Sequence, residues 1–150
     1  MGEDRLRLKK YTDYALRVLM LTASKQNNEL TSIKEIAATF SISTEHVRKV
    51  VYQLNKLDYI QTTRGRNGGI QMAQSPDQIN VGQVVRQMEQ DFVMMECFDK
   101  GINQCVLTPS CKLKHALSKA LHAYFTVLDE YTLQDILVNK EDLRRLMALD

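Results

Sequence analysis

Proline occurs only twice and glycine six times in this sequence of 150 residues, and tryptophan is absent. So little proline and glycine excludes a collagen-like chain or a Pro/Gly-rich disordered one. Long apolar runs are also missing, since none approaches the roughly 20 residues that cross a bilayer. The charged start MGEDRLRLKK lacks the apolar core of a signal peptide. We therefore expect a cytoplasmic protein with no membrane partner, folded as one compact domain or two small ones.

Catalytic motifs are missing as well. The sequence shows no Ser-His-Asp order, no glycine-rich phosphate loop and no strong carboxylate pair. Each of these would be needed for a common class of hydrolytic or phosphoryl-transfer site. The sequence therefore predicts that the protein is not an enzyme.

Charge of one sign is not in large excess, because the net charge is only +2. Its distribution is uneven: residues 1–80 hold 12 Lys/Arg and 8 Asp/Glu, whereas residues 81–150 hold 8 and 10. The N-terminal half is thus the better candidate for a polyanionic partner such as DNA. Chance scatter of surface charge is the alternative reading.

Cysteine is scarce, and all three cysteines lie in one short segment, at Cys97, Cys105 and Cys111. An odd number cannot pair completely, and disulfides are rare in a reducing compartment. Buried small side chains, a thiol–disulfide switch with one spare thiol, and structural zinc are possible readings. Zinc usually takes closer pairs such as C-x2-C, whereas the spacing here is C-x7-C-x5-C. An iron–sulfur cluster tolerates wide spacing and is the reading that the segment favours.

A cluster with four protein ligands needs one more donor than the cysteines supply. Candidates close in sequence are His115, Asp99 and Glu96, and Asp13 is a candidate distant in sequence. Spacing alone does not choose among them.

Hydrophobic periodicity predicts a mainly α fold with one small β-hairpin. Ser32 and Glu35 have the spacing of a capping box at a helix start. The hairpin is predicted from YIQTT and GIQMA, which RGRNG joins. The predicted helices cover residues 12–23, 33–40, 44–57, about 79–88, 112–131, 132–138 and 141–149.

Residues 33–54 have the pattern of a helix-turn-helix. Ala37 is the small residue where two helices cross, Ile42 anchors the turn, and Val47 and Val50 point inward. Ser41 stands where glycine is commonest in the turn, although serine can adopt that conformation. The outward face of the second helix is predicted to contact DNA, the alternative being a solvated face of an ordinary helix pair. Its residues are Ser43, Thr44, Glu45, Arg48, Lys49 and Tyr52.

The hairpin tip that follows carries Arg64 and Arg66 among three glycines and no acidic residue. Arginine is attracted to the strong negative potential of a narrow minor groove. A helix-turn-helix followed by a basic hairpin predicts a winged helix that binds double-stranded DNA. A winged helix used for protein contacts would not need arginines at this tip.

Several stretches together resemble the Rrf-two family of winged-helix regulators, and within it the nitric-oxide-sensing repressors. The resemblance covers nearly the whole chain. The matching stretches are YTDYALRVL, SISTEHVRKVVYQL, RGRNGGI, INVGQVVRQME, ECFDKGINQCVLTPSCKLKHAL and LDEYTLQDIL.

The resemblance implies a homodimer joined through the long helix, with one 4Fe–4S cluster per subunit. It also implies that Asp13 of the partner subunit is the fourth ligand, supported by Arg17 one turn later. Asp13 could instead cap its own helix. A cluster-assembly regulator of the same family carries a 2Fe–2S cluster on cysteines separated by five residues each. The pattern of that regulator also has a histidine three residues after the last cysteine. Here the first gap is seven residues and position 114 is lysine, which favours the 4Fe–4S members.

Taken together, these features predict a winged helix-turn-helix domain at residues 1–78 and a cluster-binding loop with dimerisation helices at residues 79–150. The predicted function is a cluster-dependent repressor that binds an operator as a dimer and senses nitric oxide, controlling nitrosative-stress genes. The alternatives are a 2Fe–2S cluster-status regulator and a thiol-redox or zinc-dependent DNA-binding regulator.

Overall fold

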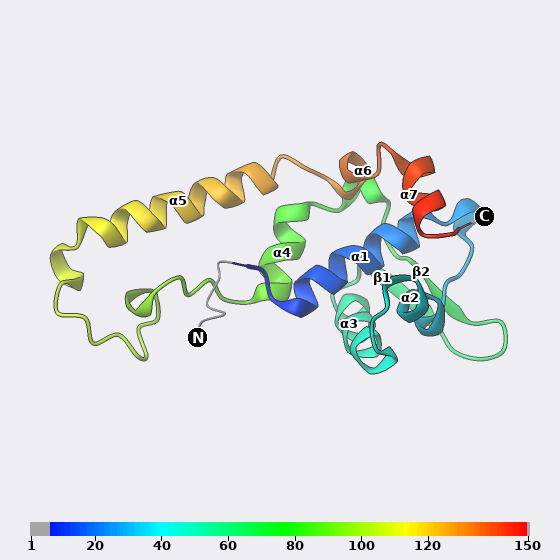
Figure 1. Cartoon of the computed structure of the whole chain (residues 1–150), viewed down its shortest axis with the longest axis horizontal. Coiled ribbons are helices and arrows are strands. Elements are labelled where there is room, and N and C mark those ends of the chain that lie inside the picture. Colours follow the sequence, from blue (N-terminus) through cyan, green and yellow to red (C-terminus); the bar gives the residue numbers. More distant parts are fainter. Residues whose placement is uncertain (1–6, 150) are drawn as a thin grey trace.

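The computed structural model describes residues 7–149; the first six residues of the predicted domain 1–78, and residue 150, lie outside it. The described chain is mainly helical with a single two-stranded hairpin (Figure 1), so the predicted fold class is confirmed. In order, the elements are α1 (Lys10–Ser24), α2 (Ile33–Phe40), α3 (Thr44–Lys56), β1 (Ile60–Thr63), β2 (Gly69–Met72), α4 (Val81–Glu89), α5 (Lys112–Leu128), α6 (Leu133–Ile136) and α7 (Lys140–Leu146). Short 3-10 turns cover Gln26–Asn28, Pro76–Gln78, Glu96–Phe98 and Thr108–Ser110.

Helix α1 lies at the centre of the main core. Its Val18 and Leu19 are fully buried, and α3, α4, β2, α6 and α7 all contact this helix. From α3, Val47 and Leu54 are fully buried in the same cluster. Burying one such side chain contributes roughly 1.5–3 kcal/mol. Because α6 and α7 also pack on α1, both predicted domains share this core, and their division at residue 78 stays a prediction.

The turn between α2 and α3 has the geometry that its sequence predicts. Ser32 caps α2 by accepting a hydrogen bond from the Glu35 N–H at 3.0 Å. The other half of the predicted capping box is wrong, because the Glu35 carboxylate instead accepts bonds from Lys25 and Thr31. Ser41 ends α2 in the left-handed conformation, at φ 54°. It therefore takes the role in which glycine is commonest.

The hairpin pairs β1 and β2 in antiparallel register, with Ile60 opposite Met72 and Thr63 opposite Gly69. Thr31 adds an isolated bridge on the other side of β2, through two backbone hydrogen bonds with Ile70 of 2.8 and 2.9 Å. This approach requires the glycine, since a Cβ on Gly69 would lie 2.8 Å from the Thr31 oxygen. The hairpin is thus attached to the segment before α2.

One end of α5 is fixed to α4 by a compact contact that we call the α4–α5 joint (Asn80, Gly82, Arg86, Phe125 and Asp129). Arg86 forms two hydrogen bonds to the Asp129 carboxylate, at 2.6 and 2.8 Å, and its guanidinium lies 4.4 Å from the Phe125 ring centroid. Asn80 donates to the Asp129 backbone oxygen at 2.8 Å. The hydrogen bond from Arg86 holds the pKa of Asp129 below its ordinary value. Gly82 has no room for a side chain, because a Cβ there would lie 1.9 Å from Asp129 Oδ1.

Beyond this joint, α5 projects away from the rest of the molecule (Figure 1). Successive helical residues are about 100° apart, so several apolar residues of α5 share one face with Tyr131 just after it. They are exposed: Leu113, Tyr124, Val127 and Tyr131 have 58%, 42%, 52% and 44% of their surface accessible. The opposite face is polar and includes Ser118, His122 and Thr126. An exposed apolar face of this kind is typical of a helix that another protein surface covers.

The C-terminal helix α7 packs against the C-terminal end of α1. Its Arg144 is buried and donates a hydrogen bond to the backbone oxygen of Ser24, the last residue of α1. A cation at the C-terminal end of a helix is favourable because carbonyl groups there lack helical partners. None of the helices within residues 7–149 is both long enough and apolar enough to span a membrane.

Candidate DNA-binding surface and cysteine loop

The second helix of the helix-turn-helix, α3, presents the predicted DNA-contacting residues outward. Ser43, Thr44, Glu45, Arg48, Lys49 and Tyr52 are all exposed, Tyr52 to 67%. Ser43 differs from the others because its hydroxyl caps α3, accepting the His46 N–H at 3.1 Å. Its DNA contact stays a prediction, but the hydroxyl already has a structural role.

The wing lies next to this helix. Asn55 of α3 accepts a hydrogen bond from the Thr62 N–H of β1 at 3.3 Å, which ties the first strand of the wing to α3. At the tip, Gly68 N–H donates to the Gly65 oxygen at 3.0 Å, and Gly65 has a φ of 104° that favours glycine. Arg64 and Arg66 on this turn are exposed. A recognition helix with a basic hairpin tied to it through its first strand suits the two grooves of one DNA duplex.

Asp13 and Arg17 form a bidentate ion pair on the surface of α1. Arg17 Nε and Nη2 donate to the two Asp13 oxygens, each at 2.9 Å. Both side chains remain partly exposed, at 48% for Asp13 and 41% for Arg17. The alternative in which Asp13 caps α1 is wrong, because α1 begins after Lys9 and has no side-chain cap. The carboxylate is instead held in place and open to solvent.

The three cysteines lie in the irregular segment between α4 and α5, which we call the cysteine loop (residues 90–111). Cys97 is buried, Cys105 is exposed and Cys111 is half-buried, and none is in a disulfide. The loop begins beside α5, where the Phe92 and Phe125 rings meet edge to face at 4.5 Å. Cys111 caps α5, and its sulfur accepts the Lys114 N–H at 3.4 Å.

This donor set fits an iron–sulfur cluster in its chemistry. Three unpaired thiols are available, and one of them sits at a helix N-terminus, where negative charge is favoured. The thiols are not brought together in this single chain. Within residues 7–149, no three His, Cys, Asp or Glu side chains are grouped closely enough to hold a metal ion. The four-ligand set of Cys97, Cys105, Cys111 and Asp13 therefore stays a prediction.

The other candidate ligands differ in what they already do. Glu96 accepts the Gln104 N–H at 3.2 Å, and Asp99 accepts the Gly101 N–H at 2.9 Å, so both carboxylates shape the loop. His115 is exposed in the first turn of α5. Among these candidates, Asp13 is the one whose two oxygens are both oriented by another side chain of the same helix, that of Arg17.

One residue of this surface was missed in the sequence. His46 belongs to α3, but its ring lies against α1, with centroids 5.7 Å from Tyr11 and 6.2 Å from Tyr14. The outward neighbours on α3 are exposed, whereas His46 is half-buried. The periodicity of α3 alone gave no signal for this contact.

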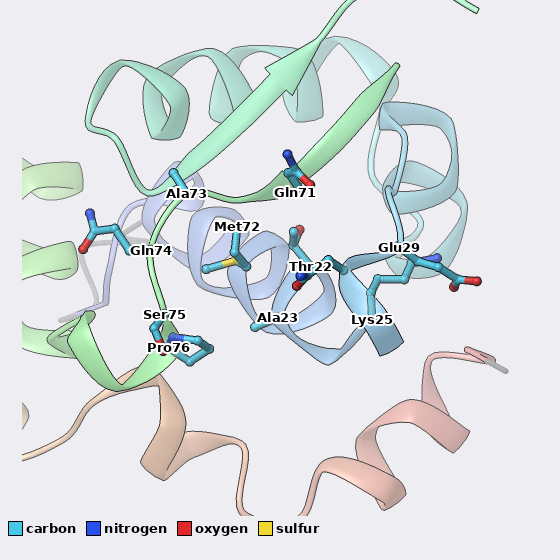
Figure 2. A pocket seen from close by; sticks show the side chains of 11 residues that line it. Thr22, Ala23, Lys25, Glu29, Gln71, Met72, Ala73, Gln74, Ser75 and Pro76 are labelled. Carbon is cyan, nitrogen blue, oxygen red and sulfur yellow. The ribbon is translucent and has the colours of Figure 1, made fainter. Parts of the chain in front are cut away.

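A pocket of about 350 Å³ lies at the C-terminal end of α1, between that helix and the segment from β2 to Pro76 (Figure 2). Thr22, Lys25, Gln71 and Met72 are among its lining residues. Of the described residues predicted to bind DNA or a cluster, none lines it. We therefore assign it no part in the predicted site.

The recognition helix, the tied wing and the exposed arginines define a winged-helix DNA-binding protein. Residues 8–139 match the family model of Rrf2, described as an iron-dependent transcriptional regulator. The chain belongs to the Rrf2 family.

Relatives extend over almost the whole chain. An HTH-type transcriptional regulator NsrR of Oceanobacillus iheyensis is 55% identical over 145 residues, covering 97% of this chain and 99% of that protein. The NsrR of Bacillus subtilis is 51% identical over 144 residues, covering 96% and 99%. These matches confirm the predicted resemblance.

Solved structures show the same fold. IscR of T. potens superposes with a TM-score of 0.71 at 22% identity, covering 95% of this chain and 94% of that one. CymR of Staphylococcus aureus in its oxidised form gives 0.70 at 22% identity, covering 89% and 97%. These structures share the fold, and the family match together with the NsrR relatives shows that the protein is a DNA-binding transcriptional regulator and not an enzyme, as the sequence predicts.

Proposed function

We propose that this protein is an iron–sulfur-dependent repressor that binds an operator as a homodimer and responds to nitric oxide. The observation that carries the proposal is the cysteine loop: three unpaired cysteines lie on the same chain as a winged helix of an iron-dependent regulator family. A 4Fe–4S cluster would supply iron that binds nitric oxide. The name NsrR, carried by relatives about half identical to this chain, supports the same function.

The dimer is inferred from α5. Its exposed apolar face, with Leu113, Tyr124 and Val127, would be covered by the same face of a second copy. Such a dimer gives two winged helices at a fixed separation, as two half-sites on DNA require. Free thiols and a labile cluster need a reducing compartment, so we also infer a cytoplasmic location.

Within this dimer, Cys97, Cys105 and Cys111 would hold the cluster, and Asp13 of the partner subunit would complete the ligand set. Thiolate is a soft ligand and carboxylate a hard one, so Asp13 would be the weakest of the four. Arg17 would orient the carboxylate through the bond pair that it already makes. Loss of the Asp13 contact would free α1, and with it the winged helix, from the partner's loop. The half-site separation would then change, and repression of nitrosative-stress genes would end.

The test is anaerobic purification with iron, sulfide and absorbance measured per subunit, followed by titration with nitric oxide and DNA-binding assays. Alanine at any one of the three cysteines should sharply reduce iron and sulfide, because two thiolates hold a cluster poorly. Ser110→Ala, next to Cys111 in the same loop, is the matched control and should keep full occupancy. Full occupancy in Cys97→Ala would refute the ligand set and point to a disulfide switch between Cys105 and Cys111. Bound zinc in place of iron would establish the zinc-dependent alternative.

Asp13→Ala separates the fourth ligand from the other three. The variant should retain a cluster on three thiolates, with a changed spectrum or changed nitric-oxide reactivity and with weaker cluster-dependent DNA binding. An unchanged spectrum together with unchanged DNA affinity would refute the role of Asp13. His115 would then be the next candidate to test.

A further inference from the structure

Three aromatic rings form a contact between α1 and the first turn of the recognition helix α3. The His46 ring meets Tyr11 edge to face, with centroids 5.7 Å apart, and lies 6.2 Å from Tyr14. Tyr11 and Tyr14 meet each other at 6.5 Å. We call Tyr11, Tyr14 and His46 the aromatic bracket. Edge-to-face contacts depend on ring angle as well as distance, so the bracket relates the orientation of the two helices.

The bracket is continuous with the Asp13–Arg17 pair. The Arg17 guanidinium lies 5.8 Å from the Tyr14 ring centroid and 5.9 Å from that of Phe40, at the end of α2. The same guanidinium donates to both oxygens of Asp13. Contacts therefore run without a gap from the Asp13 carboxylate, through Arg17 and Tyr14, to His46.

His46 stands where a small movement matters most for DNA reading. The backbone N–H of His46 donates to the Ser43 hydroxyl in the cap of α3. The exposed Thr44 and Glu45 lie between these two residues in the sequence. The N-terminal residues of a recognition helix are those that reach base edges. Further along α3, Val47 and Leu54 are held in the apolar core. The bracket thus contacts the one end of α3 that lies at the predicted base-reading position.

We propose that His46 is a positioning residue that transmits the state of Asp13 to the recognition helix. The proposal rests on the proposed function, in which Asp13 is a ligand of the partner's cluster. Any ligand that takes one Asp13 oxygen leaves only the other for Arg17, whereas the pair described here uses both. Arg17 then shifts over Tyr14, and Tyr14 carries His46 and the first turn of α3 with it. Coupling between the cluster and DNA binding is the quantity that tests this relay.

The experiment measures DNA affinity of the dimer with and without its cluster, and the ratio of the two is the readout. His46→Ala should bring this ratio close to one while iron and sulfide content and helical circular dichroism stay unchanged. His46→Phe, which keeps an aromatic ring, should restore most of the ratio. His122→Ala is the matched control, since His122 lies on the polar face of α5, and it should keep the wild-type ratio.

Two results would overturn the relay. One is a wild-type ratio in His46→Ala, even if its affinity for DNA falls in both forms. The other is equal failure of His46→Phe and His46→Ala, which would assign the imidazole a direct DNA contact. A wild-type protein whose ratio is itself one would refute the proposed function instead. In that case the relay is judged in cluster-free protein by combining Asp13→Ala with His46→Ala. A coupling factor of about fivefold or more in DNA affinity supports it, and additive effects refute it.

Discussion

Substituting alanine for Gly82 tests how tightly the α4–α5 joint is packed. Alanine in place of glycine within a helix normally stabilises by about 0.5–1 kcal/mol. Here the new Cβ would lie 1.9 Å from Asp129 Oδ1 and 3.1 Å from the Asp129 nitrogen. The carboxylate cannot move aside freely, because two bonds from Arg86, at 2.6 and 2.8 Å, hold it.

Overpacking of this kind costs about 1–3 kcal/mol, which exceeds the gain from helix propensity. We therefore expect Gly82→Ala to lower the free energy of unfolding by about 1–2 kcal/mol. For a chain of this size the melting temperature should fall by about 2–8 °C. The assay is urea unfolding of the cluster-free protein at one fixed protein concentration, because dimerisation contributes to apparent stability.

The size of the effect should depend on Asp129. In an Asp129→Ala background the obstructing carboxylate is gone, so adding Gly82→Ala should be close to neutral. In an Asp129→Asn background the side chain keeps its bulk, so the penalty should persist. If Gly82→Ala costs the same in all three backgrounds, the contact between Gly82 and Asp129 is not the cause and the reasoning is wrong.

Three further predictions concern the wing, the core and pH. Arg64→Ala and Arg66→Ala should each weaken DNA binding. Each should also reduce the slope of log affinity against log salt by about 1, as the loss of a contact with the DNA phosphates does. An unchanged slope would contradict a contact with the duplex. Leu54→Ala should lower the free energy of unfolding by about 2–5 kcal/mol in chemical denaturation, since Leu54 is fully buried, and a loss below about 1 kcal/mol would contradict its core position. Burial alone would raise the pKa of Glu35, but hydrogen bonds from Lys25 and Thr31 lower it overall. Its stabilising contribution should therefore be present above its ordinary pKa and lost as pH falls through the lowered one, and Glu35→Gln should flatten the acid limb of stability against pH.

The winged helix could be predicted because its signals are local. The spacing of Ala37, Ile42 and Val47 follows from helix geometry, and each is buried as expected. Ser41 shows the limit of residue statistics: it adopts the left-handed turn that glycine usually supplies. The hairpin followed from a change of period and a glycine-rich turn, which are also short-range features.

The parts that were missed depend on contacts between distant segments. Arg86 and Asp129 are 43 positions apart, and neither belongs to a motif that would pair them. His46 belonged to neither the predicted outward face nor the predicted inward face of its helix, because its ring packs against two tyrosines of the distant helix α1. The Glu35 half of the predicted capping box was wrong for the same reason. Lys25, ten positions before Glu35, donates to the Glu35 carboxylate instead. Three cysteines in one loop suggested a cluster, but their separation depends on a fold that local sequence does not determine.

The α4–α5 joint has a mechanical consequence for the cysteine loop. Helix α5 has 17 residues, is about 25 Å long, and is fixed to α4 at its C-terminal end. A tilt of about 5° at the α4–α5 joint therefore displaces the N-terminal end of α5 by about 2 Å. Metal–ligand distances tolerate only about 0.2 Å. In the proposed cluster, the stiffness of the contact among Gly82, Arg86 and Asp129 would therefore set how steadily Cys111 is held near the other proposed ligands.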